Sequence, residues 1–214
     1  MIDLNFFNIS EINIQNVSRE TLNDLNDYIV SVIKKNNEIN LISKNSEKSI
    51  NTRHLLDSAQ IIDFVDKNDI KLCTDLGSGA GLPGIVISIL MKERNKLFRV
   101  IFYEKSFHKS NFLKDVAKKL NLNAEINQKN IFEQKNLKTD VIISRAFKPV
   151  SVIFEIAFTN FKKFKYIILF LGKAGKEILN ETTKKWNFDY EEKKSLTSDG
   201  SLVIKISNLK KKNG

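Results

Sequence analysis

The chain has 214 residues, of which 42% are hydrophobic, and this suffices for one well-packed domain with a small extension. Its 35 basic and 25 acidic residues give a formal net charge of +10, which favours a nucleic-acid partner. No apolar run reaches membrane-spanning length, no secretory signal is visible at the start, and the single Cys73 supports neither a disulfide framework nor a metal motif. We therefore expect a cytoplasmic protein without a metal.

The lysine-rich composition has a second explanation. Only five of the 35 basic residues are arginine, and an AT-rich coding bias would enrich lysine without any functional reason. Where such a chain still uses arginine, planar bidentate recognition provides a physical reason. Arg53 and Arg145 are two of these five arginines, and both recur in the motifs described below.

Residues 1–68 are predicted to form a helical cap. Ser18 suits the N-cap of a helix whose apolar residues repeat at helical spacing and which should end near Asn36. A second helix is expected over residues 47–66. Residues 1–17 are interpreted as an arm or a short helix.

Residues 69–214 alternate between strand and helix patterns, which predicts an α/β domain with a parallel sheet. The predicted strands span residues 71–76, 98–104, 124–126, 141–144, 166–171, 190–196 and 202–208. The predicted helices span residues 84–94, 105–120, 149–161 and 175–185. No helix separates the last two strands, so we expect them to pair antiparallel and to close a mostly parallel seven-stranded sheet.

The first strand of this domain leads into a glycine-rich segment that contains Gly77, Gly79 and Gly81. Glycine allows positive φ and close approach of a ligand, and the helix that follows presents unpaired N–H groups. The spacing differs from the G-x-G-x-x-G of dinucleotide enzymes, and Asp75 precedes the first glycine by two residues. A carboxylate there is poorly placed beside a pyrophosphate, but it suits a cationic amino-acid ligand.

A second acidic residue ends the next predicted strand. Glu104 lies 27 residues past Gly77, and an acid at this position can accept hydrogen bonds from ribose hydroxyls. Together the two acids favour a nucleoside with an amino-acid tail, which is S-adenosylmethionine. We predict that this cofactor is bound by Asp75, Gly77, Gly79, Gly81 and Glu104. The alternative is a tight turn with a structural role only.

Several motifs follow one another along the chain: Asn40-Leu41, Arg53-His54-Leu55-Leu56-Asp57-Ser58, Asp75 to Gly84, Lys109 to Leu113, Ile143-Ser144-Arg145-Ala146-Phe147, and Lys173. In these motifs the chain resembles the 16S ribosomal RNA (guanine-N7) methyltransferase G family, also called glucose-inhibited division protein B. The combination is specific, whereas no single motif would be. The first thirty residues or so and the C-terminal quarter lack good matches.

This resemblance implies a class I S-adenosylmethionine-dependent methyltransferase, with a Rossmann-like fold, that methylates N7 of a guanine. The implied partner is 16S ribosomal RNA or the small ribosomal subunit, and we expect a monomer that needs neither membrane nor metal. The family pattern assigns cofactor contacts to Gly77, Leu82, Ile131, Phe132 and Arg145. Phe132 has core packing as its alternative. In many members Asp stands at the position of Glu104, which keeps the acceptor.

The resemblance also indicates residues that act on the substrate. Arg145 and His54 are the candidate catalytic residues, although a lone histidine on a helix is often only packed and hydrogen-bonded. RNA contacts are expected from Arg53, His108 and Lys109, with a solvated surface as the alternative. The family usually has Lys-Gly after the fifth strand, where this chain has Leu171-Gly172-Lys173-Ala174-Gly175, so the RNA contact of Lys173 is the weakest match.

Residues 144–147, after the fourth predicted strand, lack the N/D-P-P-Y/F motif of many enzymes that methylate nucleobase amino groups. Guanine N7 carries a lone pair and no proton, so attack on a sulfonium methyl group needs alignment and no general base. The Arg145 guanidinium would then orient base or cofactor through forked hydrogen bonds. Two other hypotheses are a dinucleotide-dependent oxidoreductase, disfavoured by the glycine spacing, and a non-catalytic RNA-binding or assembly factor.

Overall fold

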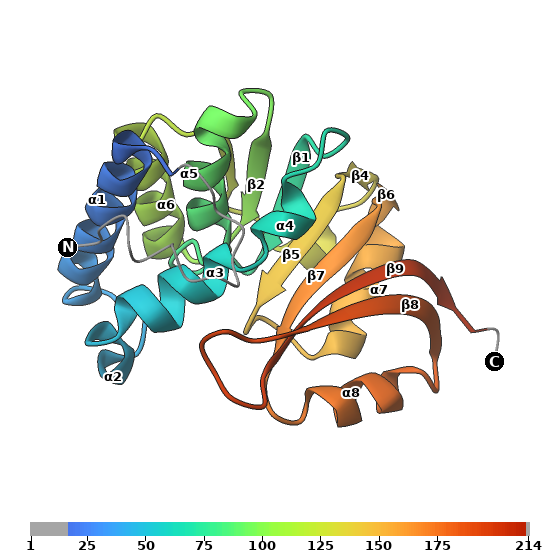
Figure 1. Cartoon of the computed structure of the whole chain (residues 1–214). Helices are drawn as coiled ribbons and strands as arrows, with labels where there is room; N and C mark the ends of the chain where they lie inside the picture. The colour runs from blue at the N-terminus through green and yellow to red at the C-terminus, as the bar shows by residue number, and fades with distance from the viewer. Residues whose placement is uncertain (1–16, 213–214) are drawn as a thin grey trace.

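A seven-stranded sheet runs through the molecule in the order β3-β2-β1-β5-β7-β9-β8 (Figure 1). The structure is a computed structural model that describes residues 17–212, so nearly all of the predicted N-terminal arm lies outside it. The strands of this sheet are β1 (Leu72–Leu76), β2 (Arg99–Tyr103), β3 (Ala124–Asn127), β5 (Val141–Arg145), β7 (Tyr166–Leu171), β8 (Trp186–Lys194) and β9 (Leu202–Lys211).

The strand directions confirm the predicted sheet. Strands β3, β2, β1, β5 and β7 pair in parallel, and β9 pairs antiparallel with both β7 and β8. The hairpin of β8 and β9 forms because only a short loop, without a helix, connects them. A second sheet of two short strands, β4 (Leu137–Lys138) and β6 (Phe161–Lys163), was not predicted.

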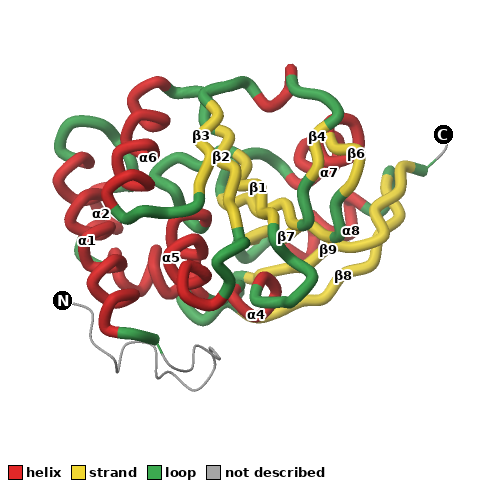
Figure 2. The backbone as a smooth tube through the Cα atoms, turned by 90° about the horizontal axis from the view of Figure 1, so that it is seen from above, coloured by secondary structure: helices red, strands yellow, loops and turns green. Residues whose placement is uncertain are grey.

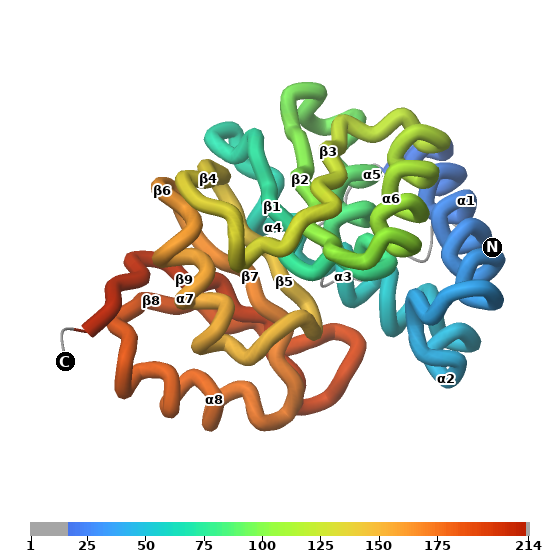
Figure 3. Tube along the Cα trace, turned by 180° about the vertical axis from the view of Figure 1, so that it is seen from behind, coloured from blue at the N-terminus to red at the C-terminus, as the bar shows by residue number. Residues whose placement is uncertain are grey.

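Helices cover both faces of the large sheet (Figures 2 and 3). They are α1 (Arg19–Asn36), α5 (Gly84–Arg94) and α6 (Phe107–Lys119) on one face, and α7 (Val150–Asn160) and α8 (Gly175–Thr182) on the other. Each face has its own buried apolar cluster, because successive strand side chains point to opposite faces. Ile143, for example, belongs to the α5 cluster, whereas Ile142 belongs to the α7 cluster.

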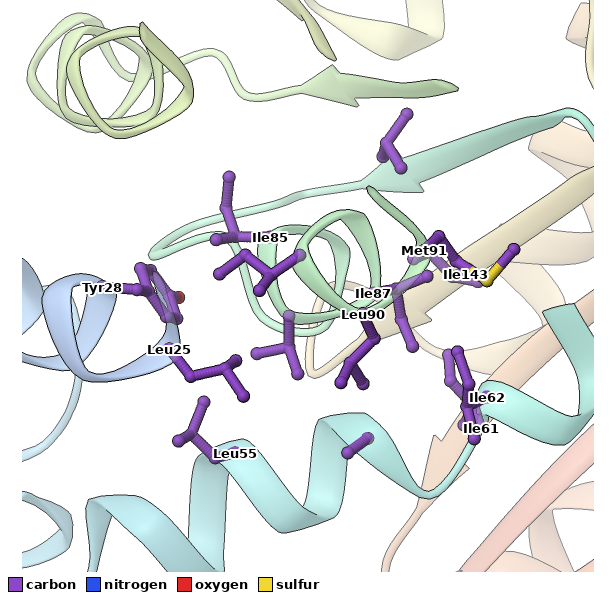
Figure 4. Close-up of a cluster of buried hydrophobic side chains, with 14 of the residues drawn as sticks. Leu25, Tyr28, Leu55, Ile61, Ile62, Ile85, Ile87, Leu90, Met91 and Ile143 are labelled. Atoms are coloured by element: carbon purple, nitrogen blue, oxygen red, sulfur yellow. The ribbon is translucent and has the colours of Figure 1, made fainter. Parts of the chain in front are cut away.

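The N-terminal helices belong to the same apolar core as the sheet. Figure 4 shows Leu25 and Tyr28 of α1 and Leu55 of the following segment on the sides of α5, which carries Ile85. Apolar residues on both sides of residue 68 thus share one cluster, while the division into a cap and a core at that residue stays a prediction. Within residues 17–212, no helix is both long and apolar enough to cross a membrane.

The first predicted helix is confirmed. Helix α1 begins after Ser18, whose hydroxyl oxygen accepts a hydrogen bond from the N–H of Thr21 at 3.0 Å.

The second predicted helix, over residues 47–66, is wrong as a single helix. The chain forms α2 (Lys44–Glu47), a π-helical segment η2 (Asn51–Leu56), α3 (Asp57–Ala59) and α4 (Ile62–Val65). A π-helical turn holds an extra residue and re-aims the side chains that follow, and such turns are frequent at functional sites. Here the re-aimed segment carries most of the R-H-x-L-D-S motif.

Candidate active site

A cavity of about 600 Å³ opens at the carboxyl ends of the parallel strands. Its lining comes from the loops after β1, β2, β3 and β5 and from the N-terminal helical segment. Such crevices are where open α/β sheets bind ligands. The sequence-predicted residues that line it are His54, Gly77, Gly79, Leu82, Glu104, Lys109, Ile131, Phe132 and Arg145.

The glycine-rich loop between β1 and α5 is anchored to the end of the neighbouring strand. The N–H groups of Gly77 and Ser78 donate to the carbonyl oxygen of Tyr103 at 2.9 and 3.3 Å. Gly77 has φ +70°, and a Cβ there would lie 2.1 Å from the Phe147 ring. Glycine is therefore required at this position both for the backbone conformation and for the contact with Phe147.

Two of the predicted cofactor residues lie behind this loop rather than in the cavity. Gly81 packs against Ile85 and Leu113 and does not line the cavity. Asp75 is only 1% exposed, and its Oδ2 accepts a hydrogen bond from the N–H of Gly84 at 3.0 Å, at the start of α5. Burial, with a contribution from the nearby Glu104 carboxylate, raises the pKa of Asp75 to about 7.

Glu104 lines the cavity at the end of β2, as the sequence predicted. Its Oε2 accepts a hydrogen bond from the N–H of Gly79 at 2.9 Å, and its Oε1 accepts one from the N–H of Ser106 at 2.8 Å. Each carboxylate oxygen has a further lone pair available. Glu104 therefore holds the glycine-rich loop and still presents an acceptor to a ligand.

Ile131 and Phe132 follow β3 in a short 3₁₀ helix, η3 (Ile131–Glu133). The side-chain oxygen of Asn130 accepts a hydrogen bond from the N–H of Phe132 and caps this helix. Ile131 is buried, whereas Phe132 is 45% exposed at the cavity. The exposed ring excludes the core-packing alternative for Phe132 and leaves one apolar face for a flat ligand.

Arg145, at the end of β5, is held by the N-terminal helical segment. Its Nε pairs with Oδ2 of Asp57 at 3.0 Å, its Nη2 donates to the carbonyl oxygen of Arg53 at 2.8 Å, and its Nη1 lies 3.2 Å from Nδ1 of His54. Ala146, the next residue, has φ +52°, a conformation that costs a non-glycine residue about 1–2 kcal/mol. Strand β5 therefore ends at Arg145, directly before this strained residue.

The hydrogen bonds of His54 indicate which of its ring nitrogens carries the proton. The hydroxyl of Ser46 donates to the carbonyl oxygen of Ser43, so it accepts a hydrogen bond from Nε2–H of His54 at 2.9 Å. Nδ1 is then the unprotonated nitrogen that faces Arg145. Burial, together with the positive charges of Arg145 and Arg53, lowers the pKa of His54 to about 4. His54 is therefore neutral at physiological pH.

The predicted RNA-contacting residues are spread over a wider surface. Lys109 lines the cavity, whereas Arg53 lines a second cavity of about 360 Å³ that shares Arg145 and Ala146 with the first. His108 and Lys173 are exposed and line neither cavity.

Sequence reasoning missed the cavity residues Lys105, Lys129, Lys148 and Leu41. Lys105 and Lys129 could have been found, because both follow a strand at its carboxyl end.

A family model described as rRNA small subunit methyltransferase G matches residues 21–203. The chain belongs to this methyltransferase G family. A ribosomal RNA small subunit methyltransferase G from Pelagibacter ubique is 48% identical over 201 residues, which cover 93% of this chain and 94% of the relative. Its counterpart from Ruegeria pomeroyi is 32% identical and covers 94% of this chain and 98% of the relative.

Solved structures agree with the fold of this methyltransferase G family member. A SAM-dependent methyltransferase from Aquifex aeolicus has a TM-score of 0.52 at 14% identity, and covers 72% of this chain and 89% of its own. The 16S rRNA methylase RmtB has a TM-score of 0.54 at 10% identity, and covers 89% of this chain and 75% of its own. These similarities show the methyltransferase fold, as the sequence predicted, and at these identities they show the fold alone.

Proposed function

We propose that this chain transfers a methyl group from S-adenosylmethionine to N7 of a guanine in small-subunit ribosomal RNA. The observation that carries the proposal is the cavity of about 600 Å³, which has a glycine-rich loop and Glu104 on one side and lysines on its rim. The family membership of the chain supports the RNA substrate, and the resemblance of the motifs supports guanine N7.

The cavity residues fit S-adenosylmethionine. The exposed glycine backbone of residues 77–79 allows close approach, Glu104 offers an acceptor for ribose hydroxyls, and Phe132 offers an aromatic face for the adenine. Asp75 would act from behind the loop, by holding the start of α5. When bound, the cofactor supplies an electrophilic methyl group on a sulfonium.

The residues near Arg145 fit a substrate atom that carries no proton. His54 is neutral, and both of its ring nitrogens take part in hydrogen bonds, so it is not a free general base. Methylation at guanine N7 does not require one, because N7 attacks with its own lone pair. We infer that His54 and Arg145 orient groups in the site rather than move protons.

The rim of the cavity fits an RNA backbone. Lys105, Lys109, Lys129 and Lys148 all line it, and none forms an ion pair with a carboxylate within residues 17–212. Unpaired ammonium groups are available to phosphates, which dominate the affinity of proteins for nucleic acids. The position of all four lysines at the cavity supports a role in RNA binding, which a coding bias toward lysine would not produce.

Mass mapping of methylated nucleotides in 16S ribosomal RNA tests the proposal, with cells that contain or lack this protein. One N7-methylguanine should disappear without the protein and return when purified protein and S-adenosylmethionine are added. Binding of the RNA without any transfer would instead indicate an assembly factor. A thermal shift produced by NAD and not by S-adenosylmethionine would indicate an oxidoreductase.

A further inference from the structure

Asp57 is the one carboxylate among the three groups that hold the Arg145 guanidinium. The other two are the carbonyl oxygen of Arg53 and the ring nitrogen of His54, both neutral acceptors. The Asp57 pair, 3.0 Å between Nε and Oδ2, is therefore the strongest of these contacts. An arginine side chain has four rotatable bonds, so its orientation depends on such partners.

Asp57 is itself fixed from its other side. The residue is 8% exposed, and its Oδ1 accepts hydrogen bonds from Nε2 of Gln60 at 2.7 Å and from the hydroxyl of Thr197 at 2.8 Å. Gln60 is fully buried and accepts a hydrogen bond from the N–H of Leu196 at 3.1 Å. Both Asp57 oxygens are thus used, one toward Arg145 and one toward the loop between β8 and β9.

Asp57 thereby joins three distant parts of the chain: α3, the end of β5, and the β8–β9 loop, 140 residues further along. Arg145 lies in the wall shared by the two cavities, whereas Asp57 lines only the second. A change at Asp57 would therefore reach the cofactor cavity through Arg145.

We propose that Asp57 is a positioning residue for Arg145 and that Thr197 holds Asp57 in place from the β8–β9 loop. The R-H-x-L-D-S motif then acts by fixing the guanidinium at the end of β5, with Asp57 itself touching neither cofactor nor base. This inference rests on the proposed methyl transfer, because the orientation of Arg145 matters only if the site works on a ligand.

A double-mutant cycle tests the coupling. Asp57→Asn keeps the shape of the side chain and removes its charge, and it should lower kcat at least tenfold, as should Arg145→Lys. If Asp57 works through Arg145, the double variant is no slower than Arg145→Lys alone. Losses that multiply in the double variant would overturn the proposal. Asp24→Asn is the matched control, since its partly buried carboxylate pairs with Lys92 of α5 outside this network, and its activity should be unchanged.

A second measurement does not depend on activity. The chain has two histidines, and a His108→Gln variant assigns the remaining ring resonance in NMR spectra to His54. In Asp57→Asn, release of Arg145 should raise the pKa of His54 above about 4, because a nearby positive charge is removed. A pKa that stays unchanged or falls would show that Arg145 keeps its place without Asp57, and would overturn the proposal.

Variants at Thr197 keep the test decisive if Asp57→Asn does not fold. Thr197→Val removes the hydroxyl at nearly constant size, and we expect it to lower kcat severalfold and to raise the pKa of His54, while Thr197→Ser preserves both. Equal behaviour of the Val and Ser variants would contradict the role of Thr197. A wild-type protein that transfers no methyl group would refute the proposed function instead, and the NMR result would still report on the Asp57–Arg145 contact.

Discussion

At the scale of single residues, two acidic side chains near the glycine-rich loop differ in environment. Glu104 lines the cavity and accepts two backbone hydrogen bonds, whereas Asp75 is buried behind the loop and has one oxygen, Oδ1, without a hydrogen-bond partner in the described structure. Burial without full pairing disfavours the charged form of an acid. The two residues therefore serve different purposes, although both were predicted as direct cofactor ligands.

Replacing Glu104 should weaken the cofactor site. We expect Glu104→Ala to lower the affinity for S-adenosylmethionine about ten- to hundredfold, since hydrogen bonds to a charged acceptor are worth roughly 1.5–3 kcal/mol. The loss has two sources, the missing acceptor and the freed N–H of Gly79. Isothermal titration calorimetry measures it, and Glu125→Ala on β3 is a control because Glu125 pairs with Arg99. Unchanged affinity in a folded Glu104→Ala protein would remove Glu104 from the site.

Asp75 should make the stability of the fold depend on pH. Its pKa is about 7 in the folded protein and about 4 when unfolded, so the folded state binds the proton more tightly. The resulting stabilisation is complete below about pH 4 and is lost as the pH rises through about 7. The slope is at most about 1.4 kcal/mol per pH unit.

Urea unfolding of Asp75→Asn and wild type between pH 4 and 8 measures this effect. Asparagine does not ionise, so the difference in free energy of unfolding should shift in favour of the variant as the pH rises to about 7 and then stay constant. The altered hydrogen bonding of the asparagine amide changes the free energy of unfolding equally at every pH, so only the pH-dependent part of the difference reports on ionisation of Asp75. Parallel pH profiles for the two proteins would show that the pKa of Asp75 is the same in the folded and unfolded states, which would contradict this prediction.

At the scale of elements, the loop between β1 and α5 is shaped by contacts from the end of β5. Phe147 packs against the backbone of Gly77, while the space around Gly79 is open, with the carbonyl oxygen of Gly77 the nearest atom to a hypothetical Cβ at 3.8 Å. Both glycines have positive φ, and both line the cavity. Substitutions at these two positions therefore separate the free-energy cost of positive φ from the cost of steric overlap with Phe147.

Alanine at these two positions should destabilise the protein to different extents. Gly79→Ala should cost about 1–2 kcal/mol, the penalty of a left-handed backbone for a side chain. Gly77→Ala carries that penalty and also overlaps the Phe147 ring, so we expect about 2–5 kcal/mol in total. Chemical denaturation measures both values, and a second substitution, Phe147→Ala, should restore part of the loss in Gly77→Ala only. Equal losses in the two alanine variants would mean that Phe147 moves aside without cost.

At the scale of the whole molecule, charged side chains gather at the carboxyl ends of the parallel strands. Four lysines lie on the rim of the cavity at the carboxyl ends of the strands, and the acidic groups Asp75 and Glu104 lie behind and inside it. The phosphate-binding lysines and the Glu104 acceptor for a cationic cofactor thus line the same cavity. This arrangement explains how one edge of the sheet can serve both ligands.

RNA binding should therefore depend steeply on salt. Neutralisation of four phosphates by the rim lysines predicts a slope of about −3 to −3.6 for log affinity against log salt concentration. Lys109→Ala should make this slope shallower by nearly one and leave the affinity for S-adenosylmethionine unchanged. Lys162→Ala is the control, because the exposed Lys162 lies in β6 of the small sheet, shortly before the amino end of β7, whereas the cavity lies at the carboxyl ends of the strands.

Filter binding over a range of salt concentrations measures the slopes. A flat dependence would mean that the lysine excess reflects coding bias alone. If Lys109→Ala loses affinity for S-adenosylmethionine and retains its affinity for the RNA, Lys109 contacts the cofactor and not the RNA, and the prediction is wrong.

The combination of motifs along the chain indicated the family. From residue 69 onward, the sequence alone also determined the glycine-rich loop, the closing hairpin, and the order along the chain of the strands of the large sheet and their helices, but not the short strands β4 and β6. These features depend on local patterns, namely apolar periodicity, glycine spacing and the absence of a helix before the last strand. Helix α5 was predicted with the observed bounds, and Gly77, Glu104 and Phe132 were correctly expected at one cavity.

Only the tertiary structure decided how the side chains are used. The partners of Arg145 come from residues 53–57, and Asp57 in turn contacts Thr197, so no local pattern reveals that network. The π-helical turn that aims these groups was read as an ordinary helix, because its apolar spacing is nearly helical. The burial of Asp75 likewise depends on the elements packed around β1, and such burial is a property of three-dimensional packing that residue order does not record.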